Sequence, residues 1–229
     1  MALAEIKKEI IKESNYQQSI NLQRFFKTGK GEYGEGDIFL GIKVPIQRRI
    51  AKTFSDLSLK EVEELLISKI HEERLISLFI LIHQFERGNE IQRETIYNFY
   101  LKNLKHVNNW DLVDSSAHKI VGAFLFFRDR KVLYNLAKSK NLWEKRVSII
   151  STAFFIARND FADTLKISKI LLHDEHDLIQ KAVGWMLREV GKRDLETEEE
   201  FLKIHYKEMP RTMLRYAIEK FPEKKRKDY

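Results

Sequence analysis

The sequence feature that most constrains the fold of this chain is the scarcity of helix-breaking residues. Its 229 residues include only three prolines, and five of its nine glycines lie between Gly29 and Gly41. Pro45 and Pro210 each stand where a helix would begin, which is the position that proline tolerates best. Alternating strand patterns are scarce, and apolar residues recur instead at helical spacing, as at Leu75, Leu78, Phe79 and Ile82. The sequence therefore predicts an all-α protein.

The helical patterns predict a series of helices joined by short connections, so neighbouring helices are expected to pair antiparallel. The one long connection, Gly29–Lys43, lacks the Gly-Lys-Ser/Thr ending of a phosphate loop and carries acidic residues, so we expect a mobile loop near a DNA-facing side. The predicted helices cover residues 3–12, 16–27, 45–54, 58–70, 73–87, 90–105, 110–125, 129–138, 142–158, 161–172, 176–193, 197–207 and 211–221.

A repeat underlies these helices. Arg74, Trp110, Arg146 and Lys181 occupy similar positions near helix starts, at spacings of 36, 36 and 35 residues. Such a period, built from two helices, is typical of an α-solenoid of antiparallel HEAT-like helix pairs with one concave binding face. The alternative is a chance alignment of four similar helix starts. The repeat predicts a single HEAT-like domain over residues 1–229.

Composition limits the classes of function. The chain is 43% hydrophobic and 33% charged, which fits a globular protein, and its lack of cysteine excludes disulfides, thiolate metal sites and a cysteine nucleophile. No apolar run is long enough for a membrane span, and the charged start does not resemble a signal peptide, so a cytoplasmic protein is expected. The net charge of +7 favours a polyanionic partner without identifying it. The basic tail, residues 223–229, is expected to fray.

The position of Asp114 in its predicted helix gives no structural reason for a carboxylate. Asp111 falls in the first turn after an asparagine cap, where its charge complements the helix dipole. Asp114 lies past that turn, and the repeat places it in a column with Leu78 and Ile150. A carboxylate in an otherwise aliphatic column requires a partner or a function. The alternative is a solvated or salt-bridged aspartate at the rim of an apolar face.

Three residues of the later helices are candidates for a binding surface. Arg146 flanks the apolar stripe of its helix, where it could face a phosphate, pair with Asp114, or be an ordinary surface charge. Trp185 lies off the apolar stripe of its own helix, so its indole either packs against a neighbouring helix or is displayed for binding. Arg188 follows three residues later on the same side.

His173 and His176 lack a third ligand, and no metal site is expected.

Several segments resemble the bacterial HEAT-like-repeat alkylpurine DNA glycosylases, the AlkD family. The specific matches are Asn109-Trp-Asp-Leu-Val-Asp114 and Lys181-Ala-Val-Gly-Trp-Met-Leu-Arg-Glu189. Trp143-Glu-Lys-Arg146 and Phe39-Leu-Gly-Ile-Lys-Val-Pro45 match in consistent order, and the resemblance spans roughly residues 20 to 220.

The resemblance implies a monofunctional DNA glycosylase that excises cationic N3- and N7-alkylated purines from double-stranded DNA without a dedicated base-flipping pocket. It implies that Asp114 is the catalytic carboxylate, and that Trp110 and Trp185 are aromatic walls beside the lesion. Arg146 and Arg188 would contact DNA. Phe25 stands where the family typically has tyrosine, so a hydroxyl at that position is lost. Neither metal nor cofactor is implied, and a monomer that associates with the nucleoid on DNA is expected.

The four central residues of this set, Trp110, Asp114, Arg146 and Trp185, are expected to converge on the concave face. A fixed carboxylate would stabilise the oxocarbenium-like transition state, and tryptophan faces would attract a cationic sugar. The rival hypothesis is a non-catalytic HEAT-repeat scaffold that binds protein or undamaged DNA. Composition, charge and repeats fit both hypotheses equally.

Overall fold

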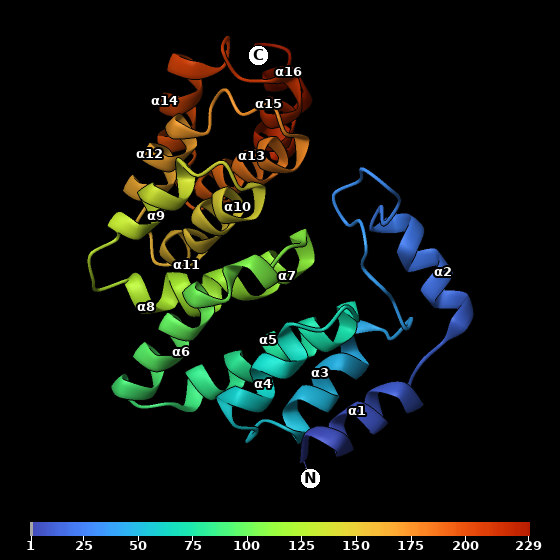
Figure 1. The fold of residues 1–229 in the computed structure, drawn as a ribbon. Helices are drawn as coiled ribbons and strands as arrows, with labels where there is room; N and C mark the ends of the chain where they lie inside the picture. The colour runs from blue at the N-terminus through green and yellow to red at the C-terminus, as the bar shows by residue number, and fades with distance from the viewer. Residues whose placement is uncertain (1) are drawn as a thin grey trace. The chain divides into compact units, whose positions relative to one another are not determined.

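The computed structural model describes residues 2–229, whose regular structure is helical, with one isolated backbone bridge between Ile38 and Ile70 (Figure 1). The predicted all-α class is confirmed. The chain divides into two compact units, one ending at Ser116 and the other beginning at Ala117. None of the described helices is long and apolar enough to span a membrane.

The first unit contains the helices α1 (Ala2–Lys12), α2 (Tyr16–Phe25), α3 (Val44–Thr53), α4 (Leu59–Leu66), α5 (His71–Arg87), α6 (Glu90–Lys102), the short η1 (Leu104–His106) and all but the last residue of α7 (Trp110–Ala117).

The second unit contains η2 (His118–Gly122), α8 (Ala123–Leu125), α9 (Lys131–Ala137), α10 (Leu142–Ser151), α11 (Ala153–Ile156), α12 (Ala162–Ile170), α13 (Asp177–Gly191), α14 (Leu195–His205), α15 (Arg211–Ala217), η3 (Ile218–Lys220) and α16 (Glu223–Arg226).

Side-chain caps explain where several of these helices begin. The side chains of Ser58 and Asn89 each accept a hydrogen bond from the backbone N–H three residues on. The side chains of Glu61 and Gln92 accept one in turn from the backbone N–H of the cap residue, which completes a capping box at α4 and α6. Asn141 caps α10 in the same way without the return bond. These caps satisfy backbone N–H groups that have no partner inside the helix.

Three predicted helices are interrupted. The helix predicted over 58–70 ends at Leu66, and the one predicted over 142–158 is divided at Thr152 into α10 and α11. The helix predicted over 110–125 changes at His118–Gly122 into a wider π-helical turn. A π-helical turn accommodates one extra residue, which apolar spacing alone does not reveal.

Helix α5 forms the core of the first unit. It packs against α3, α4 and α6 (Figure 1), and its residues from His71 to Ile82 are all buried. Because neighbours cover several sides of α5, polar groups near its start are buried together with its apolar stripe. These groups, His71, Glu72, Glu73 and Arg74, need partners inside the protein.

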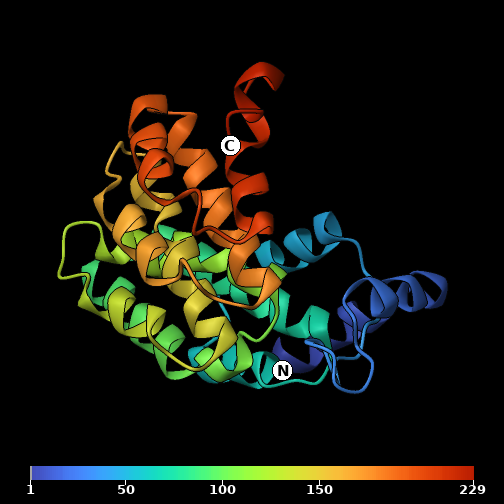
Figure 2. The same cartoon turned by 90° about the horizontal axis from the view of Figure 1, so that it is seen from above.

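The segment between α2 and α3 folds back along α2, as Figures 1 and 2 both show. The Asn15 N–H donates to the Leu40 carbonyl at 2.8 Å, next to Gly41. Gly41 has φ +84°, and a Cβ there would lie 2.1 Å from the Asn15 carbonyl oxygen, so only glycine fits.

The second half of that segment is fixed, which corrects the expectation of a mobile loop. The carboxylate of Glu72 accepts hydrogen bonds from the backbone N–H groups of Leu40, Gly41 and Ile42 at 2.8–3.2 Å. The Phe39 side chain is buried. Glycine content indicated flexibility, but the buried carboxylate that anchors the backbone lies 30 residues further along the sequence.

Helix α13 is central to the second unit, where it packs against α10, α12, α14 and α15. Its approach to α15 depends on Gly184, because a Cβ at Gly184 would lie 2.3 Å from the Met213 carbonyl oxygen and 2.6 Å from the Tyr216 Cβ. The two helices therefore meet backbone to backbone beside Trp185.

The helix starts give a second way to compare the positions of the predicted repeat. Asp114 is the fifth residue of α7, just as Arg146 and Lys181 are the fifth residues of α10 and α13. Asp114 therefore shares its level along the helix with charged residues, whereas the sequence alignment paired it with Leu78 and Ile150. The column that pairs Asp114 with Leu78 and Ile150 stays a prediction, and the surroundings of Asp114 are described below.

Candidate functional site

The centre of the candidate site in the first unit is Trp110, the first residue of α7. Its ring stacks on Phe26, with the ring centroids 5.0 Å apart and an angle of 10° between the planes. Phe25, at the end of α2, meets Trp110 edge to face at 5.8 Å. The indole N–H donates to the Tyr33 hydroxyl at 3.3 Å. These contacts fix the half-buried Trp110 ring, while Phe25 remains 63% exposed.

A buried polar network holds the start of α7. Asn109 is fully buried; its side-chain oxygen accepts from the Trp110 N–H at 2.8 Å, and its amide donates to Asp37 at 3.3 Å. Asp111 pairs with the Nε2 of His71 at 2.8 Å. Asp111 therefore has a second role beyond the helix dipole, because it joins α7 to α5.

His71 is positioned between two carboxylates. Its Nδ1 lies 3.0 Å from Asp37, while its Nε2 faces Asp111. Burial lowers the pKa of His71, but the charge and hydrogen bond of Asp111, together with Asp37, outweigh it and raise the pKa from 6.5 to about 9. His71 is thus an imidazolium at neutral pH and donates from both nitrogens.

Asp37 is held as an anion by the same network. Burial raises the pKa of its carboxyl, but the hydrogen bond from His71 and the charge of Arg74, which lies 2.7 Å away, lower it below the ordinary value. The His71 ring also stacks on Phe39 at 4.4 Å, and Phe39 stacks on Phe26. A continuous column of rings therefore runs from the buried imidazolium to Trp110.

Asp114 lies one helical turn beyond Trp110 on α7 and is half-buried. It is close enough to the buried Tyr100 for its charge to raise the pKa of that hydroxyl, although burial of Tyr100 is the larger cause. Its separation from Trp110 places both side chains on one side of α7. The first unit therefore presents a fixed aromatic ring and a partly exposed carboxyl on one helix.

The second unit holds Trp185 by a different kind of contact. The half-buried indole donates to the Glu189 carboxylate at 3.1 Å, one helical turn along α13. Glu189 also binds Lys192 at 2.7 Å and lies 3.7 Å from Arg188. Arg188 forms an ion pair with Glu219 as well. The Arg188 charge is therefore largely balanced inside the unit.

Arg146 lies in the interior of the second unit. It is 5% exposed, and its guanidinium donates to the Leu178 carbonyl at the start of α13. Sequence reasoning left open a contact with phosphate, a pair with Asp114 and an ordinary surface charge for Arg146, because its helical stripe gave no sign that a chain segment 32 residues away would contact it. The predicted contact with DNA stays a prediction.

Phe25, Trp110 and Asp114 belong to the first unit, and Phe25 and Trp110 are in contact. Arg146, Trp185 and Arg188 belong to the second, where Trp185 and Arg188 share a contact with Glu189. The predicted convergence of the two sets stays a prediction. Across residues 2–229, no three histidine, aspartate or glutamate side chains gather in a way that could hold a metal ion.

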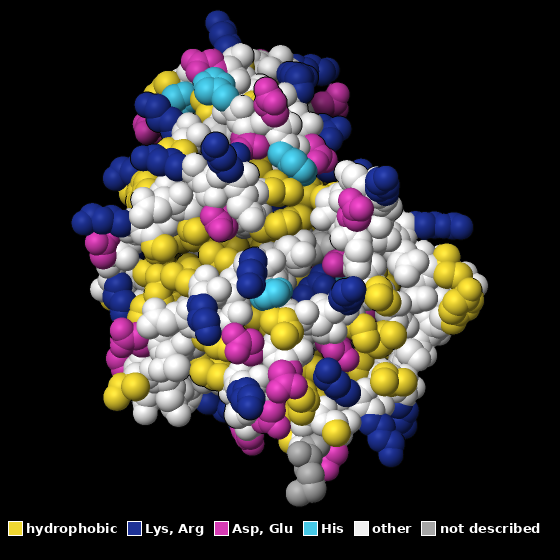
Figure 3. All heavy atoms as spheres, in the orientation of Figure 1, with side chains coloured by type: hydrophobic (Ala, Val, Ile, Leu, Met, Phe, Trp, Pro, Cys, Tyr) yellow, Lys and Arg dark blue, Asp and Glu magenta, His cyan; other side chains and the backbone are white. Residues whose placement is uncertain are grey.

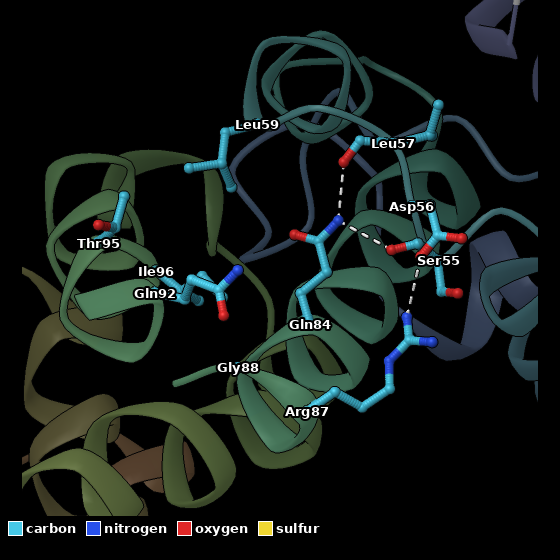
Figure 4. Close-up of a pocket in the computed structure, with 10 residues that line it drawn as sticks. All are labelled: Ser55, Asp56, Leu57, Leu59, Gln84, Arg87, Gly88, Gln92, Thr95 and Ile96. Carbon is cyan, nitrogen blue, oxygen red and sulfur yellow. Dashed lines mark hydrogen bonds and ion pairs between the residues drawn. The ribbon is translucent and has the colours of Figure 1, made fainter. Parts of the chain in front are cut away.

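A separate pocket in the first unit contains none of these residues. It has a volume of about 430 Å³ between α4, α5 and α6. Figure 4 shows the Gln84 amide donating to the Ser55 and Leu57 carbonyls, and Arg87 paired with Asp56. These polar groups of the lining already bind other residues of the protein. We therefore place the candidate site at Trp110 and not in this pocket.

Sequence reasoning missed the supporting residues, among which Asp37, His71 and Phe26 matter most. His71 lies 34 residues from Asp37 and 40 from Asp111, so no local motif connects them. One signal was present: the chain places His71 and three charged residues directly before the apolar run of α5. Charged groups that become buried require partners, and this pattern could have prompted a search for them.

Comparisons with known proteins relate the whole chain to DNA repair. Residues 6–221 match the family model described as "DNA alkylation repair enzyme". Among solved structures, a predicted DNA alkylation repair enzyme from Enterococcus faecalis superposes with a TM-score of 0.71, at 17% sequence identity, over 92% of this chain and 98% of that one. A search of curated protein sequences finds no match. Because the family model covers nearly the whole sequence, the chain belongs to the DNA alkylation repair enzyme family.

Proposed function

We propose that this protein is a monofunctional DNA glycosylase that hydrolyses the N-glycosidic bond of cationic N3- and N7-alkylated purines in double-stranded DNA. The observation that carries the proposal is the pairing on α7 of a fixed Trp110 ring with Asp114 one turn later. Membership of the DNA alkylation repair enzyme family supports the reaction class.

The chemistry needs few protein groups. Alkylation at N3 or N7 makes the purine cationic and weakens its bond to the sugar before the enzyme acts. As that bond breaks, positive charge develops on the deoxyribose, and a fixed carboxylate next to C1′ stabilises it. Asp114 would supply this anion and position the attacking water. Trp110 would offer its ring face to the cationic sugar and exclude bulk solvent.

The remaining predicted residues are assigned by the same resemblance. Trp185 would form the second aromatic wall, and its indole is oriented by Glu189. Phe25 would contact DNA through its exposed ring beside Trp110. Arg188 and Arg146 would act near the backbone. For Arg146, burial against Leu178 favours a role in holding the start of α13, and a direct contact with phosphate would require exposure of its guanidinium.

We further propose that the helices form one HEAT-like array that acts as a monomeric domain and binds duplex DNA on a concave face without a base pocket. Glycosylases with a pocket must extrude the target base, which costs unstacking energy. A cationic lesion reduces the need for such a pocket, because the departing base is already activated.

The decisive experiment compares the wild type with Asp114→Asn in the release of 7-methylguanine from methylated duplex DNA. A preorganised electrostatic contact is typically worth about 3–4 kcal/mol, or on the order of 100- to 1,000-fold in rate, and its loss leaves DNA affinity nearly unchanged. The baseline is spontaneous release from the same DNA. Asp129→Asn is the matched control, because the Asp129 side chain is 65% exposed.

Two results would contradict the proposal. Release by Asp114→Asn at the wild-type rate would reduce Asp114 to a surface carboxylate. Release by the wild type at only the spontaneous rate would favour the non-catalytic scaffold that binds protein or undamaged DNA.

A further inference from the structure

The basic C-terminal tail carries specific contacts, which the prediction of a frayed end did not include. Residues 223–226 form α16, and Lys225 pairs with Glu199 of α14. The Tyr229 ring packs edge to face against Tyr206 at 5.4 Å and lies 5.9 Å from Phe221. These contacts hold α16 against the rest of the second unit.

One consequence of this folding is a hollow of about 560 Å³ beside α15. Its lining includes three arginines, Arg211 and Arg215 of α15 and Arg226 of α16. It also includes Thr212, Glu219 and Tyr229. In Figure 3, Lys and Arg side chains (dark blue) are visible at the surface over the α15 and α16 end of the chain. The hollow is therefore lined by three exposed arginines from two successive α-helices.

Little negative charge inside the unit balances these arginines. The one acidic side chain of the lining, Glu219, already pairs with Arg188 and Lys220. Within residues 2–229, none of the three arginines forms an ion pair with a carboxylate. Their N–H donors are therefore not committed to a carboxylate of the protein and can bind an anion from outside.

We propose that this hollow is a binding site for phosphate groups. Arginine presents a planar fork of N–H donors that matches the oxygens of phosphate. Arg211 and Arg215 stand four residues apart on one helix, so their side chains share a face. Thr212 and Tyr229, which each carry a hydroxyl group, also line the hollow. The phosphate is either a phosphodiester of the DNA backbone or a free phosphate ion.

The first arm of the test measures binding of a short undamaged DNA duplex across a series of salt concentrations. Arg211→Gln, Arg215→Gln and Arg226→Gln are combined in one variant. Its control combines Lys138→Gln, Lys166→Gln and Lys169→Gln, which removes equal charge from exposed positions of the same unit. If the hollow binds the backbone, the arginine variant loses affinity on the order of tenfold. Its slope against log salt also falls by about 0.9 for each lost contact, beyond any change in the control.

The second arm measures the melting temperature in added pyrophosphate, which stabilises a folded protein that binds it. The hollow is assigned to free phosphate if pyrophosphate stabilises the wild type and the control but not the arginine variant. In that case the two variants also bind DNA equally. Equal behaviour of the two variants in both arms overturns the proposal. Circular dichroism verifies that each variant folds. Neither arm requires base excision, so the outcome is independent of whether the protein is a glycosylase.

Discussion

The two tryptophans of the candidate site are supported in contrasting ways. Trp110 stands on stacked rings above a buried, charged network that contains His71, Asp37 and Asp111. Trp185 is oriented by Glu189, a partly exposed carboxylate that it shares with Lys192 and Arg188. Buried pairs are strongly coupled to folding, whereas exposed pairs contribute little. The support of Trp110 is thus coupled to the stability of the first unit, whereas the support of Trp185 contributes little to the stability of the second.

The buried charges of the two units differ in the same sense. His71 has a carboxylate at each ring nitrogen. Glu198, on α14 beside α13, is 1% exposed, and its Oε1 has no hydrogen-bond partner. Burial raises the pKa of Glu198 to about 8, and the charge of Glu199 adds to the effect. His71 is thus a buried ion with compensating partners, while Glu198 is a buried acid that is costly to ionise.

The largest effect should come from His71→Gln. This change removes the positive charge between Asp37 and Asp111 and leaves buried carboxylates undercompensated, which typically costs about 3–5 kcal/mol. Urea unfolding followed by circular dichroism measures the loss. The control is His173→Gln, because the His173 side chain is 71% exposed. Equal stabilities of the two variants would show that the network does not support α7.

The pH dependence of stability sharpens the comparison. The pKa of His71 is about 9 in the folded protein, against 6.5 for an ordinary histidine. Its contribution is therefore fully present below pH 6.5 and is lost as pH rises through 9, by about 3 kcal/mol in all. The difference in unfolding free energy between wild type and His71→Gln should shrink across this window. A difference independent of pH would mean that His71 is neutral when folded.

Glu198→Gln should act in the opposite direction. The pKa of Glu198 is about 8 in the folded protein, against 4.5 for an ordinary glutamate. Between these pH values the carboxyl is ionised in the unfolded chain but still protonated in the folded protein, so the free energy of unfolding falls as pH rises from about 4.5 to 8. A neutral glutamine avoids this loss, and we expect a gain of about 1–3 kcal/mol at pH 8 with little change at pH 4. Glu200→Gln is the control, because Glu200 is exposed on the same helix. A destabilised Glu198→Gln would show that the ionised form has a partner.

The smallest effect on stability belongs to Glu189→Ala. Partly exposed ion pairs contribute about 0–1 kcal/mol, so the unfolding free energy should hardly change. The Trp185 indole loses its hydrogen bond, and its fluorescence should respond, as seen in a Trp110→Phe, Trp143→Phe background that leaves Trp185 as the one tryptophan. If excision slows in Glu189→Ala while stability is unchanged, Glu189 positions Trp185 for catalysis. A loss comparable to that of His71→Gln would erase the contrast between the two tryptophans.

The sequence predicted the helices well because their signals are local. Apolar stripes such as the one from Leu75 to Ile82 repeat every three or four residues, and caps such as Ser58 and Asn141 lie within a turn of the helices they begin. Both signals arise from neighbours in the chain, so they can be recognised without knowledge of tertiary contacts. The interruptions at Thr152 and at His118–Gly122 left no such signal.

The supports of the candidate site could not be predicted, because they join distant segments. Asp111 appeared fully explained by its place in the first turn, yet its main partner, His71, lies 40 residues earlier. Arg146 is covered by the start of α13, 32 residues later. Local patterns identified which residue types are unusual, but tertiary packing determines which of them reach the surface.

The close contact at Gly184 has a consequence for how the second unit opens. Since α13 and α15 meet through their backbones at Gly184, neither helix can separate without exposing the other. Hydrogen exchange in native proteins proceeds through cooperative units of this kind. The amide protons of α13 and α15 should therefore exchange together and slowly. Trp185, the residue after Gly184, is thus attached to a segment that rarely unfolds by itself, although its own side-chain hydrogen bond is formed at the surface.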